Sequence, residues 1–302
     1  SADLPLNISR EILQKTPMVE SIKSALTKRV LDMLSKLAKK DQEKYATFWS
    51  QFGTVLKEGP SEDHTNKEKI AKLFLFSSSN MNDEKPTVTL EGYVSRMKEK
   101  QKKIYYVTGD SISSLRNSPY LEAFKKHNIE VLLMHDRIDE WMMGYLTEFD
   151  GKQFQDIAKG ELDLDEITDS SGEEKKTAKK KDSKSDEKVI SKIGDILDNR
   201  VSGVRTTSRL THSPACLVVG EHDMGEQMRK IMEAAGQSVP ETKPTLEINV
   251  KHPLVKKIKG SEENKEVKML TQLLFDQALL SAGRPLDDPA NFVKGINKLM
   301  FS

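Results

Sequence analysis

Residues 262–302 constrain the fold of this chain more than any other stretch. At helical spacing they form an apolar helix that ends at Gly283 and Pro285, and a second one that Asp288 caps and Pro289 begins. Faces this wide need a cover, either from the preceding domain or from the same hairpin of a second copy. We expect a homodimer with a four-helix bundle, which a charged residue at Leu274 or Ile296 should break. The predicted interface residues are Leu270, Leu273, Leu274, Leu280, Phe292, Ile296 and Leu299.

The composition indicates a charged, mostly helical, soluble protein. With 302 residues the chain can hold two domains or three small ones. Its 48 basic and 47 acidic residues nearly cancel, so the net charge favours neither nucleic acid nor an anionic membrane. We find no apolar run long enough to cross a membrane and no signal peptide. Cys216, the single cysteine, is expected to be a small buried hydrophobe, which fits a reducing cytosol and a cytoplasmic location.

The first 80 residues are predicted to form a helical layer. Pro17 begins a long amphipathic helix, Asp41 caps the next helix, and a further helix runs from about 66 to 76. The first of these helices carries one apolar face, made of Ile22, Leu26, Val30, Met33, Leu34 and Leu37. His64 has no histidine or cysteine at ligand spacing, so no metal site is predicted there or elsewhere.

Residues 81–168 are predicted to form a small three-layer α/β subdomain. Strands at 102–109 and 129–134 enclose a helical segment at 110–128, which is the spacing of a βαβ unit, and another helix is expected over 135–149. The turn at Gly109 has none of the glycine patterns of a nucleotide site and is interpreted as a plain strand-to-helix turn.

Residues 169–187 are predicted to be a mixed-charge linker, and residues 188–302 a mixed α/β domain. This last domain is expected to contain strands at 201–207, 213–220 and 245–252. Its predicted helices are 189–199, 222–237 and 252–258, followed by the terminal hairpin. It has no readable nucleophile–base arrangement and no phosphate-binding loop.

The helix predicted at 222–237 carries the most informative pattern inside the chain. Met224, Met228, Ile231 and Met232 share one face at spacings of four, seven and eight residues. Such a face is usually packed in a core. Methionine, however, also suits surfaces that adapt to different partners, so both interpretations stay open. The segment DEWMMGY offers Trp141, Met142 and Met143 as a comparable surface.

Several long segments resemble one protein family. LPLNISREILQ, HDRIDEWMMGYLTEFDGKQFQ, RLTHSPACLVV and RPLDDPANFVKGINKLM are similar to the bacterial HtpG branch of the ninety-kilodalton heat-shock chaperone family, and the resemblance covers essentially the whole chain. It implies the distal part of the middle domain followed by a C-terminal dimerisation domain. The nucleotide-binding domain of the family is not represented.

The resemblance also implies roles for individual residues. The motif SREILQ places the catalytic arginine of the family at Arg10 and its accompanying glutamine at Gln14, both acting on ATP and Mg²⁺ that another domain holds. A role toward a ligand would explain a cation at a helix start, which opposes the helix dipole. The surface for client proteins maps onto Glu140, Trp141, Met224, Met228, Ile231 and Met232.

We therefore predict a molecular chaperone fragment that pairs with itself, binds non-native proteins and depends on an N-terminal ATPase domain. By itself the chain is expected to be no enzyme and to hold no cofactor, with neither nucleic acid nor membrane as partner. One alternative is a small hydrolase built on the βαβ unit, for which the sequence offers no catalytic pair. The other is a nucleic-acid-binding adaptor that uses the lysine-rich helix 23–40 and the linker, which would show a steep salt dependence.

Overall fold

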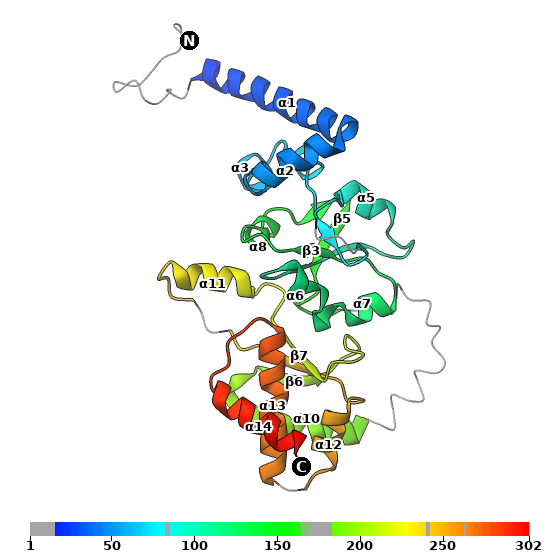
Figure 1. Ribbon diagram of the computed structural model, residues 1–302. Coiled ribbons are helices and arrows are strands. Elements are labelled where there is room, and N and C mark those ends of the chain that lie inside the picture. The colour runs from blue at the N-terminus through cyan, green and yellow to red at the C-terminus, as the bar shows by residue number, and fades with distance from the viewer. Residues whose placement is uncertain are drawn as a thin grey trace. The chain divides into compact units, whose positions relative to one another are not determined.

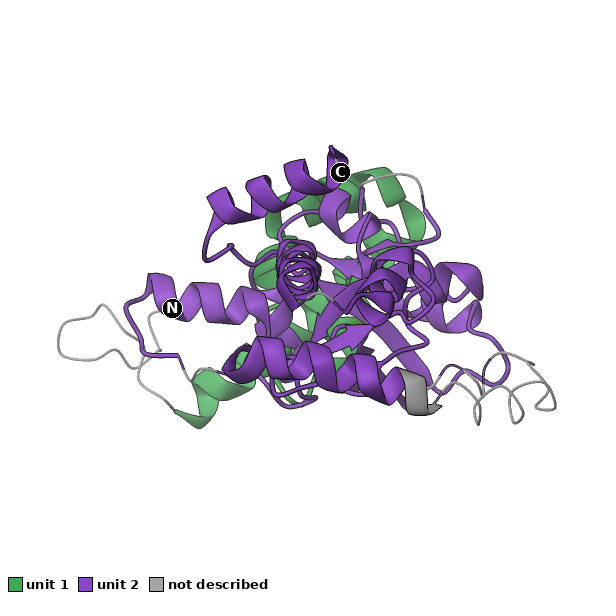
Figure 2. Cartoon of the chain, turned by 90° about the horizontal axis from the view of Figure 1, so that it is seen from below, with its two compact units in different colours: residues 1–75 green, residues 76–302 purple. Residues whose placement is uncertain are grey.

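The computed structural model describes residues 16–81, 85–162, 164, 167, 183–239, 242–262 and 264–301 (Figure 1). The chain divides into two compact units, residues 1–75 and residues 76–302, which Figure 2 colours separately. The described part of the chain contains helices and two sheets with both parallel and antiparallel strand pairs. The predicted combination of a helical part with α/β parts is therefore confirmed. None of the helices described is long and apolar enough to cross a membrane.

The first unit is built from α1 (Pro17–Lys40), α2 (Gln42–Leu56), α3 (Gly59–Glu62) and α4 (Lys67–Ala71). The predicted helix starts at Pro17 and Asp41 are confirmed. Asp41 ends α1, and its carboxylate accepts a hydrogen bond from the Lys44 N–H of α2 at 3.1 Å. The core contains Trp49 against Phe74, and the Tyr45 hydroxyl donates to the Leu73 carbonyl oxygen. Buried aromatic rings thus close a small helical layer.

The apolar face of α1 is largely exposed within this chain. Leu34 is buried, but Ile22, Leu26, Val30 and Met33 are exposed by 40–57% within this chain. Helical periodicity identifies an apolar stripe but not whether another part of the chain covers it. The helix predicted up to residue 76 is also too long, since α4 ends at Ala71.

The second unit contains a five-stranded mixed sheet in the order β1-β3-β2-β5-β4. Its strands are β1 (Ser77–Ser78), β2 (Lys103–Thr108), β3 (Leu132–Met134), β4 (Glu148–Phe149) and β5 (Lys152–Asp156). Strand β2 pairs in parallel with both β3 and β5, so the predicted βαβ unit is confirmed. The helices connected to these strands are α5 (Leu90–Ser95), α6 (Ile112–Arg116), α7 (Glu122–Lys126) and α8 (Asp139–Met143).

Two helix predictions in this region are too long. The segment 110–128 breaks into α6, a 3₁₀ turn at Pro119–Leu121 and α7, since Ser118 and Pro119 interrupt it. The segment 135–149 forms only α8 before the chain turns into β4. The β4–β5 hairpin, with Asp150 and Gly151 at positive φ in its turn, was not predicted, although an Asp-Gly pair is a strong hairpin signal.

A three-stranded sheet in the order β6-β8-β7 follows. It consists of β6 (Gly203–Thr206), β7 (Ala215–Val218) and β8 (Thr245–Ile248), as predicted. The accompanying helices are α10 (Ser183–Leu197), α11 (Glu226–Ala234), α12 (Pro253–Gly260), α13 (Asn264–Ser281) and α14 (Pro289–Met300). The predicted cap at Asp288 is confirmed, and Gly283 has the positive φ of a helix-ending glycine.

Of the two possible covers for the terminal hairpin, the preceding part of the chain covers α13. Strand β7 and helices α10, α12 and α14 surround it, and Leu270 and Leu274 are fully buried. Helix α14 crosses it at Gly295, where a Cβ atom would lie 2.8 Å from a methyl carbon of Leu273. The uncovered apolar side chains of the hairpin are Leu280, Val293, Met300 and Phe301.

The two sheets of the second unit share one buried cluster, in which Tyr105 and Leu133 lie with Cys216 and Val218. Cys216 is 1% exposed, which confirms that it is a buried hydrophobe, and burial raises the pKa of its thiol. This cluster contains residues of both sheets, so the two sheets share a core. The predicted domain boundary between residues 81–168 and 188–302 stays a prediction. Most of the predicted linker, residues 169–182, lies outside the described residues, whereas residues 183–187 belong to α10.

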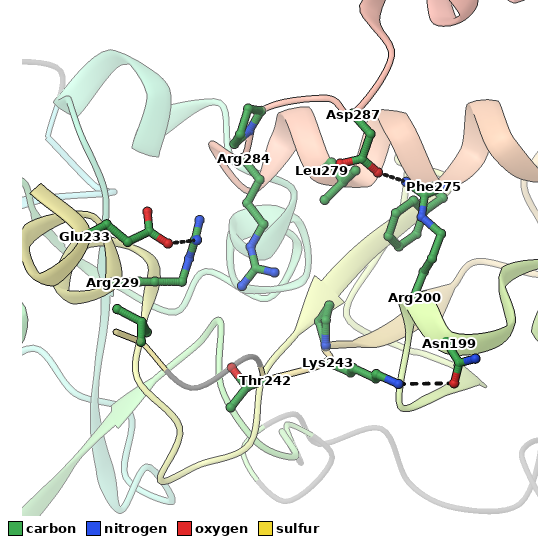
Figure 3. A pocket seen from close by; sticks show the side chains of 13 residues that line it. Asn199, Arg200, Arg229, Glu233, Thr242, Lys243, Phe275, Leu279, Arg284 and Asp287 are labelled. Carbon is green, nitrogen blue, oxygen red and sulfur yellow. Dashed lines mark hydrogen bonds and ion pairs between the residues drawn. The ribbon is translucent and has the colours of Figure 1, made fainter. Parts of the chain in front are cut away.

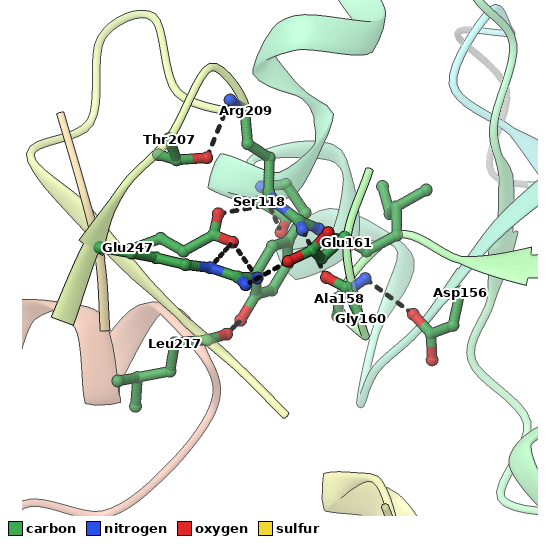
Figure 4. A network of polar contacts seen from close by, with 12 residues as sticks. Ser118, Asp156, Ala158, Gly160, Glu161, Thr207, Arg209, Leu217 and Glu247 are labelled. Carbon is green, nitrogen blue, oxygen red and sulfur yellow. Dashed lines mark hydrogen bonds and ion pairs between the residues drawn. The ribbon is translucent and has the colours of Figure 1, made fainter. Parts of the chain in front are cut away.

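Polar contacts also link the two sheets of the second unit (Figure 4). The Arg209 guanidinium donates to the Glu247 carboxylate at 3.0 Å and to the carbonyl oxygens of Ile157 and Gly160. At a second point, the Glu122 carboxylate accepts backbone N–H groups of the loop before β7. Burial alone would raise the pKa of Glu122, but these N–H groups hold it below its ordinary value.

Candidate functional site

Helix α11 presents the methionine face that the sequence singled out. Met224, Met228 and Met232 are half-buried, and Ile231 is 39% exposed. None of the four belongs to the buried core of the unit. The apolar face of α11 is therefore partly accessible within this chain, and its use as a binding surface stays a prediction.

Polar contacts hold α11 in place on its other sides. The Gln227 side chain donates to the carbonyl oxygen of Gly109 at 2.6 Å, and Lys230 pairs with Asp110 at 2.8 Å. Arg284 pairs with Glu226 at 2.9 Å. The turn at Gly109, predicted to be a plain strand-to-helix turn, is thus one of the anchors of α11. A helix fixed by its polar side keeps its apolar side free for other contacts.

Glu140, on α8, makes the closest of these contacts. One carboxylate oxygen accepts the Gly225 N–H at 2.5 Å, and the other accepts the Met228 N–H at 2.9 Å. Lys159 lies 3.3 Å from the same carboxylate and also donates to the Asp223 carbonyl oxygen at 2.9 Å. The side chains of Glu140 and Lys159 are only 9% and 14% exposed. Sequence reasoning singled out Glu140 but missed Gly225 and Lys159.

A cleft of about 920 Å³ separates α8 and β5 from the segment that leads into α11. Its apolar lining includes Trp141, Tyr145, Phe154, Met224 and Met228. Trp141 is half-buried and packs on Tyr145 with ring centroids 4.8 Å apart. The expectation that Met142 extends this surface is wrong, because its side chain is fully buried. Met143 is only 7% exposed but still lines the cleft beside Trp141.

Asp156, at the end of β5, is the buried acid of this cleft. It is 6% exposed, and its carboxylate accepts the Ala158 N–H at 2.8 Å. Burial raises the pKa of Asp156 to about 6, although Lys159, the Ala158 N–H and Arg209 act in the opposite direction, and Glu140 adds to the rise. The Asp156 carboxyl, which lines the cleft, therefore titrates near pH 6.

This raised pKa predicts a pH-dependent stability difference for Asp156→Asn. The folded pKa lies above the unfolded value of 3.8, so the contribution of Asp156 to stability is present at pH 3.8 and below and is lost as the pH rises through 6. Asparagine does not ionise. The stability of the variant relative to wild type should therefore increase between about pH 4 and pH 7, by on the order of 2–3 kcal/mol. Urea unfolding of both proteins across this range measures it, and parallel profiles would contradict it.

A second cleft, of about 450 Å³, lies between α11 and α13 (Figure 3). Several cations line it, but they have partners: Arg229 pairs with Glu233 at 2.5 Å, and Arg200 pairs with Asp287 at 2.7 Å. The Arg200 guanidinium also stacks over the Phe275 ring, 4.3 Å from its centroid. This cleft is a network of paired charges that joins α11 to the end of α13.

The sequence profile of the Hsp90 protein family matches residues 1–302, which is the whole chain. The chain belongs to the Hsp90 family. Proteins of this family are stress-response chaperones that hydrolyse ATP, and they generally dimerise and bind client proteins. That this Hsp90 chain belongs to the bacterial branch stays a prediction.

The remaining predicted site residues of the Hsp90 chain differ in accessibility. Arg10 and Gln14 lie outside the described residues. Of the predicted interface residues, Leu270, Leu273 and Leu274 are buried within the chain. Phe292, Ile296 and Leu299 are half-buried, and Leu280 is 48% exposed. Val293, Met300 and Phe301, which the prediction omitted, are exposed by 55–85%. Among the described residues, no group of three or more acidic, histidine or cysteine side chains is arranged to hold a metal.

Proposed function

We propose that this Hsp90 chain binds non-native proteins through the methionine face of α11 together with Trp141. The observation that carries the proposal is the accessibility of this face on a helix that polar contacts hold. Thioether side chains adapt their rotamers to different partners, and an aromatic ring at the same cleft adds a rigid anchor. Each contact is modest in affinity, which suits a chaperone that must release its clients.

We further propose that the chain pairs with a second copy through the exposed side of α14 and Leu280. Two copies of a weak client site in one dimer raise avidity without tight binding at either site. In a longer protein of the family, Arg10 and Gln14 would assist the hydrolysis of ATP and Mg²⁺ held by another domain, while the present chain neither binds nor hydrolyses ATP. A cytoplasmic location is also proposed, in keeping with the buried Cys216 thiol.

Replacing Met228 and Met232 together by glutamine tests the client surface. Glutamine keeps the length and helix propensity of methionine but removes its apolar character. The affinity for a partly unfolded protein should fall roughly fivefold to tenfold, whereas the melting temperature should hardly change because both side chains are partly exposed. Binding and aggregation-suppression assays measure the first effect, and thermal melts measure the second.

The matched control replaces Met18 and Met33 of α1 by glutamine, since both are more than half exposed. This control should leave client binding unchanged. Equal losses of affinity in both variants would mean that any exposed methionine can bind client proteins. A loss of several kcal/mol of stability, which buried large side chains cost at roughly 2–5 kcal/mol each, would mean that α11 packs as core.

A further inference from the structure

The N-terminus of α11 lacks a local cap. A helix start usually has a serine, threonine or aspartate whose side chain accepts the N–H two or three positions on, and a glutamate at the third position often reaches back to the cap residue's own N–H. The cap position of α11 is Gly225, which has no side chain, and no residue of the helix itself caps it by a side-chain hydrogen bond. Glu140 does both tasks, because its two oxygens accept the N–H groups of Gly225 and Met228.

The glycine is required for this contact. A Cβ atom at Gly225 would lie 2.3 Å from one carboxylate oxygen of Glu140 and 2.8 Å from the other. Any other residue at position 225 would therefore displace Glu140. The carboxylate and the glycine are 85 residues apart in the chain and fit together as one unit.

Lys159 completes the arrangement. Its ammonium group pairs with Glu140 and donates to the Asp223 carbonyl oxygen, so it holds both α8 and the segment before α11. The negative charge of Glu140 is also favourable at the positive end of the α11 dipole. Charge, hydrogen bonds and shape all point to one function for this carboxylate.

We propose that Glu140 is a positioning residue for α11 and not a contact for client proteins. It caps the helix from α8 and thereby sets the placement of the methionine face relative to Trp141, its neighbour in the chain. Both carboxylate oxygens are occupied and the side chain is 9% exposed, so little of it is left for a client. The expected effect on client binding rests on the proposed function, whereas the capping of α11 by Glu140 does not depend on it.

The test uses Glu140→Ala in the full chain with two readouts. Amide hydrogen exchange of residues 225–234 reports on the helix, and binding of a partly unfolded protein reports on the surface. Loss of the cap should accelerate exchange of these amides by roughly tenfold or more and should weaken client binding. Glu221→Ala is the control, since it removes an exposed carboxylate from the same cleft and should change neither readout.

A second variant separates capping from other effects. In Glu140→Ala with Gly225→Asp, the aspartate occupies the vacated space and supplies a local cap, so the exchange of α11 should return toward the wild-type rate. Unchanged exchange in Glu140→Ala, or no recovery in the double variant, would overturn the proposal, as would weaker client binding with unaltered exchange. If exchange accelerates while the Met228 and Met232 variant still binds clients normally, the positioning role stands and the proposed client surface fails.

Discussion

Glu247→Ala is expected to lower the free energy of unfolding of the second unit by about 3–5 kcal/mol. The Glu247 carboxylate accepts three hydrogen bonds, two from Arg205 and one from Arg209. Arg209 is 3% exposed and Glu247 is 4% exposed, so removal of the carboxylate leaves a buried guanidinium without its counter-charge. Urea unfolding of wild type and variant measures the loss.

Glu161→Ala is the matched control. It breaks the ion pair with Arg205 at 3.0 Å, but Glu161 is 88% exposed, and exposed pairs contribute less than about 1 kcal/mol. A double variant, Arg209→Met with Glu247→Leu, should lose less than the sum of the two single variants, because no buried charge is left without a partner. A loss of less than 1 kcal/mol in Glu247→Ala would show that water reaches Arg209 in solution and that the pair is not an isolated buried one.

Val293→Asp is expected to convert the proposed dimer into folded monomers. Val293 is 55% exposed on α14, so the substitution costs the monomer little, and valine and aspartate have similar helix propensities. In the proposed dimer, the short aspartate side chain cannot reach water, so each copy would bury one unpaired carboxylate. We expect the dissociation constant to rise by roughly a hundredfold or more, measured by light scattering over a concentration series.

Leu274→Asp serves as the contrasting variant. The sequence-based expectation was that a charge at Leu274 yields monomers, but Leu274 is 0% exposed within one chain, so this variant should unfold the domain instead. Circular dichroism distinguishes the two results. If the wild-type chain is already monomeric at about ten micromolar, where an interface of 2,000 Å² or so should hold, the dimer proposal is wrong.

Helix starts and ends were predictable because their signals are local. Pro17, Asp41, Asp288 and Gly283 act through backbone geometry and hydrogen bonds within a few residues, and each occupies the predicted position. The buried parallel strand at Leu132–Met134 was likewise evident from its uniformly apolar sequence. Of the segments predicted too long, 110–128 contains a local signal that was overlooked, Pro119, and 135–149 turns into β4.

The sequence by itself determined which residues are apolar on one face, where most elements begin, and, through long motifs, which family is resembled. Only the tertiary structure decided which faces are covered. It buries Leu274 but leaves Leu26 and Val293 exposed, although all three lie on apolar helical stripes. Burial depends on which other segments reach a face, and local periodicity carries no information about that.

At the candidate site, too, the sequence indicated an apolar helix face, and only the tertiary structure determined its contacts. The spacing of Met224, Met228 and Met232 marked α11 as unusual, yet it could not tell core from surface. The cap on α11 comes from Glu140, 85 residues earlier, and the buried partner of Arg209 is Glu247, 38 residues later. A single sequence contains the residues of such pairs but not their proximity, because folding alone brings distant carboxylates, guanidinium groups and backbone N–H groups within hydrogen-bonding distance.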